Sequence, residues 1–306
     1  MRSDVLIENF KVGGLAKFGL DYKSLAPECP RLIYCSITGF GQTGPYASRA
    51  GYDLMAQGIG GFMSLTGMAG GEPTRAGVPV ADIFTGVYAV VGVLAALHAR
   101  STSGVGEWVT TSILGTSLAW LSMHLVTHLL GGDAPAPLGT RSPFFAPYEA
   151  YRTADGYLVV VGTGGRDGWR AFCGALGLEE LADDRRFATN AERVRNAEAL
   201  KEEIEVVLGA DTSARWSAAL DAAGVPAAPV QDLADALDSP QVRALGLVGE
   251  QCHPTAGEIP MVRLPIGLSG HPTTSGAPPP LLDAHRSLIP DRETDGSPNQ
   301  RRRRTA

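Results

Sequence analysis

The strongest β-strand pattern in this sequence is Leu32-Ile33-Tyr34-Cys35-Ser36-Ile37, which ends at Gly39 and Gly41. A short apolar run bounded by turn residues predicts a buried strand. Another short run, Val5-Leu6-Ile7, comes earlier in the chain, and broken helical pieces over residues 15–25 lie between the two. A strand, a helical connection and a second strand predict a parallel sheet covered by helices, so the expected fold class is α/β.

Two long apolar segments follow this strand pair. Asp82 precedes the first, Ile83–Arg100, and a short strand at Trp108–Thr111 separates it from the second, Ile113–Leu130. Both segments have the length of helices, but they carry Gly, Thr, Ser and His residues. Neither offers the roughly 20 lipid-compatible residues of a membrane span. We therefore expect two buried helices and no membrane partner.

The character of the sequence changes after the Gly- and Pro-rich stretch 131–147. Tyr148–Arg152 and Tyr157–Val161, joined through Asp155-Gly156, predict a β-hairpin. Polar amphipathic helices are expected near 166–177, 190–208 and 212–223. The expected division is 1–112 for a partial, N-terminally incomplete large domain, 113–147 for a connecting helix and linker, 148–245 for a smaller α+β domain, 246–272 for a return to the large domain, and 273–306 for a disordered tail.

Composition excludes several classes of partner. The 306 residues carry 26 Lys+Arg and 32 Asp+Glu, a net charge of −6. An acidic chain argues against a general nucleic-acid binder, whose domain is normally basic. The first strand begins within a few residues of Met1, so no signal peptide is predicted. The four cysteines are scattered with no C-x-x-C pair, which predicts reduced thiols and a cytoplasmic protein.

Asp82 is the sharpest candidate for chemistry, and it has two interpretations. As the residue before a helix, it fits an N-cap whose side chain accepts a backbone hydrogen bond worth about 1 kcal/mol. As a carboxylate kept ionised by the helix N-terminus, it fits a nucleophile that attacks an activated acyl group. Both interpretations place Asp82 at the same point of the helix, so position alone does not separate them.

Two glycine-containing segments could approach a ligand. Gly51-Tyr52-Asp53, after Ala50, leads into a helix, and its backbone amides could hold an anion or form a plain turn. Gly162-Thr163-Gly164-Gly165 follows a strand and precedes a helix, which suits a mobile loop over a site as well as a simple turn.

A metal site is not predicted. His124 and His128 share a helix face, but Leu125 stands where a zinc-binding helix of this spacing carries glutamate. The two histidines are therefore interpreted as core or interface residues.

Several of these segments resemble, in order, the family III CoA-transferases, a group that also includes acyl-CoA racemases. The resembling stretches are Asp4–Phe10, Pro30–Gln42, Gly51–Asp53, Gly77–Asp82, Ala146–Tyr151 and Phe187–Val194. The resemblance runs from residue 4 to about residue 270. So many ordered motifs are more specific than any one of them, and they favour the nucleophile interpretation of Asp82.

The resemblance implies a role for each matching position. Asp82 falls on the nucleophilic aspartate, and Gly162–Gly165 lies near a glycine loop that closes over the site. The CoA-contacting positions that the resemblance implies are Asn9, Phe10, Lys11, Lys17, Ala50, Gly51, Tyr52 and Asp53, with Lys17 meeting the nucleotide phosphates. The implied fold is a Rossmann-like large domain plus a small domain in an interlocked homodimer. CoA and acyl-CoA are implied as substrates, with no tightly bound cofactor and no metal.

The implied reaction moves CoA from an acyl-CoA thioester to a carboxylic acid through an aspartyl-CoA intermediate on Asp82, with the helix N-terminus and nearby backbone amides stabilising the oxyanions. An acyl-CoA racemase or epimerase of the same fold is an alternative, but Tyr52 stands where the racemases carry a catalytic histidine. The resemblance also leads us to expect that the chain lacks the family's N-terminal segment. A catalytically inactive, truncated remnant is therefore a further alternative.

Overall fold

A computed structural model describes residues 3–162, 165–271 and 277–288 of the chain. The chain divides into two compact units, residues 1–228 and residues 229–306, and each is described by itself. The domain bounds expected from the sequence stay predictions.

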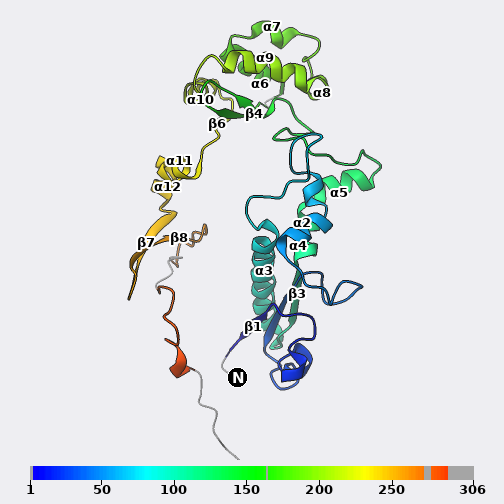
Figure 1. Cartoon of the computed structure of the whole chain (residues 1–306), viewed down its shortest axis with the longest axis vertical. Coiled ribbons are helices and arrows are strands. Elements are labelled where there is room, and N and C mark those ends of the chain that lie inside the picture. The colour runs from blue at the N-terminus through cyan, green and yellow to red at the C-terminus, as the bar shows by residue number, and fades with distance from the viewer. Residues whose placement is uncertain (1–2, 163–164, 272–276, 289–306) are drawn as a thin grey trace, which may run out of the picture. The chain divides into compact units, whose positions relative to one another are not determined.

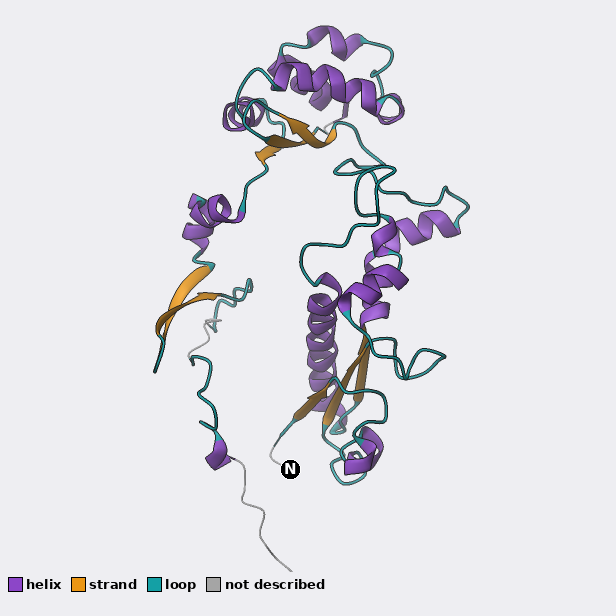
Figure 2. Cartoon of the chain, viewed as in Figure 1, coloured by secondary structure: helices purple, strands orange, loops and turns teal. Residues whose placement is uncertain are grey.

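A three-stranded parallel sheet forms the centre of the first half of the chain (Figures 1 and 2). Its strands are β1 (Val5–Glu8), β2 (Ile33–Thr38) and β3 (Trp108–Ser112), in the order β1-β2-β3. Both pairs are parallel, with Cys35 of the middle strand opposite Ile7 on one side and Val109 on the other. The middle strand is the most buried of the three, as its continuous apolar pattern predicted, and the parallel sheet confirms the predicted α/β class.

Helix α3 (Val80–Ser103) packs on β2 and β3. The approach is close, since a Cβ added at Gly92 would lie 2.6 Å from Cγ1 of Val109. By length and apolar composition alone, α3 is the one helix in the described part of the chain that would also qualify to cross a membrane, a test that core helices of soluble proteins pass as well. Its buried residues are few: Ala81, Thr85, Ala89 and Ala96. The prediction of a buried helix is therefore wrong for most of α3, because large apolar side chains outside this stripe have no covering surface within the described chain.

Shorter helices complete this part. They are the 3-10 helix η1 (Ala16–Phe18), α1 (Tyr22–Leu25), α2 (Asp53–Ile59), the 3-10 helix η2 (Phe62–Ser64), α4 (Ile113–Trp120) and α5 (Ser122–Leu129). The predicted single helix 113–130 is two helices, because Leu121 leaves the helical region with ψ near 7°. The side chain of Ser112 caps α4 by accepting the amide of Gly115 at 3.1 Å.

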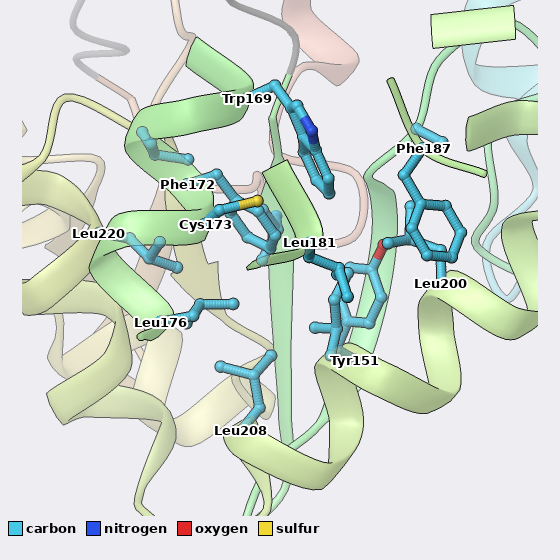
Figure 3. Packing of buried hydrophobic residues seen from close by; sticks show 14 of the residues in the cluster. Tyr151, Trp169, Phe172, Cys173, Leu176, Leu181, Phe187, Leu200, Leu208 and Leu220 are labelled. Carbon is cyan, nitrogen blue, oxygen red and sulfur yellow. The ribbon is translucent and has the colours of Figure 1, made fainter. Parts of the chain in front are cut away.

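The segment after residue 146 has its own core (Figure 3). Strands β4 (Tyr148–Arg152) and β5 (Tyr157–Val161) form the predicted antiparallel hairpin, and β6 (Ala227–Pro229) joins them. The helices are α6 (Gly165–Leu176), α7 (Glu179–Asp183), α8 (Asn190–Arg195), α9 (Ala197–Leu208) and α10 (Ser213–Ala222). Their apolar faces enclose Trp169, Phe172, Phe187 and Leu200, each at most 1% exposed. The predicted helix 190–208 breaks at Asn196 into α8 and α9.

The second unit is small. Helices α11 (Leu233–Asp238) and α12 (Pro240–Leu245) lead into the antiparallel pair β7 (Val248–His253) and β8 (Gly257–Val262). Of the predicted disordered tail, residues 273–276 and 289–306 lie outside the described residues. Within the described part, Arg286–Leu288 form the 3-10 helix η3.

Arg193 is a buried cation of α8 that binds two backbone carbonyls, and its replacement should destabilise the fold. Its guanidinium donates to the carbonyl of Ala146 at 2.6 Å and of Phe187 at 3.0 Å, and lies 4.7 Å from the ring of Trp169. We expect Arg193→Leu to lower the free energy of unfolding by about 2–4 kcal/mol, because two buried carbonyls lose their donor. Urea unfolding measures this, with Arg195→Leu as the control.

Arg195 lies on the same helix, is exposed, and forms an ion pair with Glu192 three residues before it. Its replacement should change the free energy of unfolding by less than about 1 kcal/mol. Equal effects of the two substitutions would contradict the anchoring role of Arg193.

Candidate active site

A pocket of about 540 Å³ lies where the parallel strands end. Residues that directly follow β1 and β2 line it, together with the first turns of α3. This is the position at which open α/β sheets bind ligands, outside the carboxyl ends of their strands. The lining residues are Asn9, Phe10, Lys11, Val12, Ile37, Thr38, Gly39, Ala47, Arg49, Ala50, Gly51, Tyr52, Asp82, Thr85, Gly86 and Ile113.

The pocket brings together most of the residues predicted from the sequence. Seven of the nine line it: Asn9, Phe10, Lys11, Ala50, Gly51, Tyr52 and Asp82. Lys17 does not; it lies in η1 with its ammonium 4.8 Å from the ring of Phe18. Asp53 does not line the pocket either, because it is buried at the start of α2 with 9% of its surface exposed.

The structure corrects the N-cap interpretation of Asp82. Helix α3 begins at Val80, so Asp82 is its third residue and not its cap. The capping group is the carboxylate of Asp53, whose Oδ1 accepts the amides of Ala81 at 2.8 Å and Asp82 at 3.2 Å. The Asp82 carboxylate is thereby left for another use. Asp53 precedes Asp82 by 29 residues in the chain, so no local pattern could have revealed this cap.

The same contacts correct one of the two predicted sources of oxyanion stabilisation, the helix N-terminus, while nearby backbone amides stay a prediction. The amides of Val80 and Ile83 donate to the carbonyls of Val78 and Pro79, and Asp53 takes the two amides between them. All four amides of the first turn of α3 therefore already have acceptors. Donors for a developing oxyanion must come from elsewhere in the pocket.

The pKa of Asp82 is raised above the usual value of an aspartate, first by partial desolvation and then by the negative charge of Asp53. The sequence led us to expect the opposite influence, a helix N-terminus that favours the ionised form. The buried carboxylate of Asp53 accounts for the difference. It neutralises the positive end of α3 and places a like charge beside Asp82, and both effects raise the pKa of Asp82.

Gly51 is required by packing. A Cβ on Gly51 would lie 2.2 Å from the Cα of Gly39, and a Cβ on Gly39 would lie 2.4 Å from the Cα of Gly51. The two backbones, one leaving β2 and one entering α2, therefore touch directly. The sequence left an anion site and a plain turn open for Gly51-Tyr52-Asp53; close backbone contact is a third explanation for the glycine.

Sequence reasoning missed two polar residues of this region. Arg49 lines the pocket, and its guanidinium lies 4.5 Å from the ring of Tyr46. Its position directly before the segment Ala50–Asp53 could have identified Arg49 as a candidate from the sequence. Gln57 is fully buried on α2 and donates a hydrogen bond to Asp53. The spacing of four residues between them is visible in the sequence, but the burial of Asp53, which calls for a hydrogen-bond partner, is not.

Other predictions touch the site less directly. A second pocket of about 530 Å³ shares Lys11 and Val12 with the first. The predicted loop Gly162–Gly165 includes Thr163 and Gly164, which lie outside the described residues. In the described part of the chain, no three His, Cys, Asp or Glu side chains cluster as a metal ion would require.

The raised pKa of Asp82 predicts a pH-dependent cost to stability. A carboxyl group whose pKa is higher in the folded than in the unfolded chain favours folding while protonated, and that contribution disappears as the pH rises through the folded pKa. At neutral pH, Asp82→Asn should therefore unfold at a temperature equal to or above that of the wild-type chain. The difference should vanish at acidic pH, where Asp82 is also neutral. Thermal unfolding across pH measures it, and a variant less stable at neutral pH would contradict the assignment.

The structure places the Asp82 carboxylate, in the first turn of α3, at a pocket beyond the carboxyl ends of parallel strands, where open α/β sheets bind their ligands. The model of CoA-transferase family III matches residues 1–286, and the chain belongs to that family.

Similar proteins agree with this membership. Succinate–glutarate CoA-transferase of Agrobacterium fabrum is 43% identical over 293 residues, which are 94% of this chain and 72% of that protein. Succinyl-CoA:glutarate CoA-transferase of Mus musculus is 36% identical over 94% of this chain and 65% of its own length. A crystal structure of a CAIB/BAIF family protein from Brucella suis superposes with a TM-score of 0.81 at 41% identity, covering 94% of this chain and 74% of that one. The chain thus spans about two thirds to three quarters of the length of these three proteins.

Proposed function

We propose that this chain transfers CoA from an acyl-CoA thioester to a carboxylic acid, with Asp82 as the covalent nucleophile. The observation that carries the proposal is the placement of Asp82. Among the described residues that line the pocket it is the one acidic side chain, and the task of capping α3 falls to Asp53 instead. A carboxylate in that position is available to attack.

The proposed reaction has two mirrored halves. An oxygen of ionised Asp82 attacks the thioester carbonyl, and the C–S bond breaks to give a mixed anhydride and CoA thiolate. The thiolate then attacks the aspartyl carbonyl, which releases the donor acid as a carboxylate and leaves aspartyl-CoA. The acceptor carboxylate attacks that thioester and expels the thiolate again. Attack of the thiolate on the acceptor's acyl carbonyl yields the new acyl-CoA and restores Asp82.

CoA would contact the segments that follow β1 and precede α2, namely Asn9–Lys11 and Ala50–Tyr52. Lys11 is better placed than Lys17 to meet a phosphate, because it lines both adjoining pockets while Lys17 lines neither. Asp53 acts as the cap of α3 and not as a CoA contact. The sheet is proposed to be the core of a Rossmann-like domain.

Dicarboxylic acids are the proposed substrate class. Succinate and glutarate appear in the names of the Agrobacterium and mouse relatives. The pocket carries two cationic side chains, Lys11 and Arg49, against the single carboxylate of Asp82. A net positive lining suits a substrate that keeps one free carboxylate while the other reacts.

A homodimer is proposed for the assembly. The support is the uncovered side of α3, where Ile83, Val87, Val90, Val91 and Leu94 are each 50–59% exposed. Apolar surface of this extent usually marks a protein interface. Sedimentation equilibrium of the purified chain distinguishes a dimer from a monomer.

A racemase or epimerase would need an acid or base beside Asp82 that titrates near neutrality. The pocket offers Tyr52 at the position where the racemases carry histidine. Histidine is the side chain that ordinarily exchanges a proton near neutral pH, so the racemase role lacks its usual residue here. Transfer is therefore favoured over racemisation.

Trapping the intermediate tests the proposal and also the alternative of an inactive remnant. The purified chain is mixed with succinyl-CoA and hydroxylamine, and peptides are mapped by mass spectrometry. A hydroxamate on Asp82, absent from Asp82→Ala, is the expected result. A folded chain that gives no hydroxamate and no transfer would overturn the proposal in favour of the remnant.

A further inference from the structure

Gln57 is a fully buried polar residue of α2, and the proposed chemistry does not use it. It lies on α2, four residues after Asp53, and it does not line the 540 Å³ pocket. A buried amide is costly unless both of its polar atoms are hydrogen-bonded. Its partners therefore indicate what it is for.

The side chain of Gln57 joins two segments of the site. Its Nε2 donates to Oδ2 of Asp53 at 2.5 Å, and its Oε1 accepts the amide of Ala76 at 3.0 Å. Ala76 lies in the loop that leads into α3. The other oxygen of Asp53, Oδ1, accepts the amides of Ala81 and Asp82. A continuous set of hydrogen bonds thus runs from the loop through Gln57 and Asp53 to the backbone of Asp82.

A primary amide is the neutral group that fits both contacts. One contact needs a donor that faces a carboxylate, and the other needs an acceptor that faces a backbone amide. An ionised glutamate would present an acceptor to Asp53 and add a second buried negative charge. A protonated glutamate, with one O–H donor and one carbonyl acceptor, would match the glutamine.

We propose that Gln57 is a positioning residue for the nucleophile: by holding the Asp53 carboxylate against the first turn of α3, it fixes the backbone from which Asp82 reaches the pocket. The proposal rests on the proposed function for its catalytic meaning. Without Gln57, Asp53 is free to rotate away and release the two amides. The first turn of α3 then loosens, and a displacement of about 1 Å at a reacting group can cost on the order of 10²-fold in rate.

Kinetics of Gln57→Glu test this role. Because Gln57 does not contact the substrate pocket, kcat should fall about 10- to 100-fold at neutral pH while KM for succinyl-CoA changes little. Activity should recover toward the wild-type level at acidic pH, where the buried glutamate is protonated; burial beside Asp53 raises its pKa into a measurable range. Gln241→Glu, the same change at an exposed position of α12, should leave the pH profile unchanged.

Hydrogen exchange gives a readout that needs no turnover. The amides of Ala81 and Asp82 should exchange at least about tenfold faster in Gln57→Ala than in the wild-type chain, while amides of α9 keep their protection. Unchanged exchange at these two amides, or a Gln57→Glu chain with wild-type kcat at neutral pH, would overturn the proposal. If the wild-type chain itself forms no adduct on Asp82, the proposed function fails, and the exchange measurement still decides whether Gln57 positions Asp53.

Discussion

An Asp82→Asn chain is expected to transfer CoA between succinyl-CoA and glutarate on the order of 10⁴-fold more slowly than the wild-type chain. Asparagine keeps the shape of the side chain, but its amide has no anionic oxygen to attack the thioester. The fold should be unaffected, because the cap of α3 is Asp53 and its bonds to the amides of Ala81 and Asp82 do not involve the Asp82 side chain.

Steady-state transfer measured by chromatography of the acyl-CoA products checks this expectation. Asp221→Asn, the same change at an exposed position of α10, is the control and should retain full activity. A loss of less than about tenfold in Asp82→Asn would mean that another group is the nucleophile. The same variant should be no less stable at neutral pH, so loss of activity through unfolding is separable from loss of the nucleophile.

The elements that could be predicted from the sequence are those whose cause is local. The middle strand β2 follows from one apolar run that ends at glycines, and the β4–β5 hairpin follows from two strand patterns around an Asp-Gly turn. Asp82 could be singled out because a carboxylate before a long apolar helix is visible in the sequence. The breaks at Leu121 and Asn196 were missed because the apolar pattern continues across both positions.

What the sequence did not reveal depends on contacts between distant segments. Asp53 was assigned to CoA, yet it is buried and caps α3, a contact that only the packing of α2 against α3 creates. Lys17 was assigned to the nucleotide phosphates from the resemblance; it lies in η1 and lines neither pocket, and its role stays a prediction. An apolar helix sequence indicates that the helix tends to be buried, but it does not tell which surface covers it. Helix α3 was therefore predicted to be buried, although the described chain leaves much of it exposed.

If Asp82 is the nucleophile, as we propose, the contacts of Asp53 give each of the two aspartates a separate role. A helix N-terminus with free amides would hold an aspartate strongly in its ionised form, and such a carboxylate is a weak nucleophile. Because Asp53 takes the amides of Ala81 and Asp82, the Asp82 carboxylate keeps a raised pKa and loses no oxygen to capping. Asp53 therefore caps the helix, and the carboxylate of Asp82 stays available for the proposed attack.

Gly51→Ala should damage both stability and activity. The added Cβ would lie 2.2 Å from the Cα of Gly39, and neither atom belongs to a flexible side chain, so the two backbones must separate. We expect the free energy of unfolding to fall by about 3 kcal/mol. Gly77→Ala is the matched control, since a Cβ there meets nothing within 4 Å.

Gly51→Ala should lower activity because the backbone contact between Gly51 and Gly39 also positions Asp53. Gly51 directly precedes Tyr52 and Asp53, so a displaced backbone moves the carboxylate that caps α3 and, through it, Asp82. A shift of about 1 Å at the nucleophile predicts a further loss on the order of 10²-fold in kcat among the molecules that remain folded. Urea unfolding and steady-state kinetics on the same preparations separate the two effects. If Gly51→Ala matched Gly77→Ala in both measurements, the direct backbone contact between β2 and α2 would not exist, and the glycine at position 51 would again be explained only as an anion site or a turn.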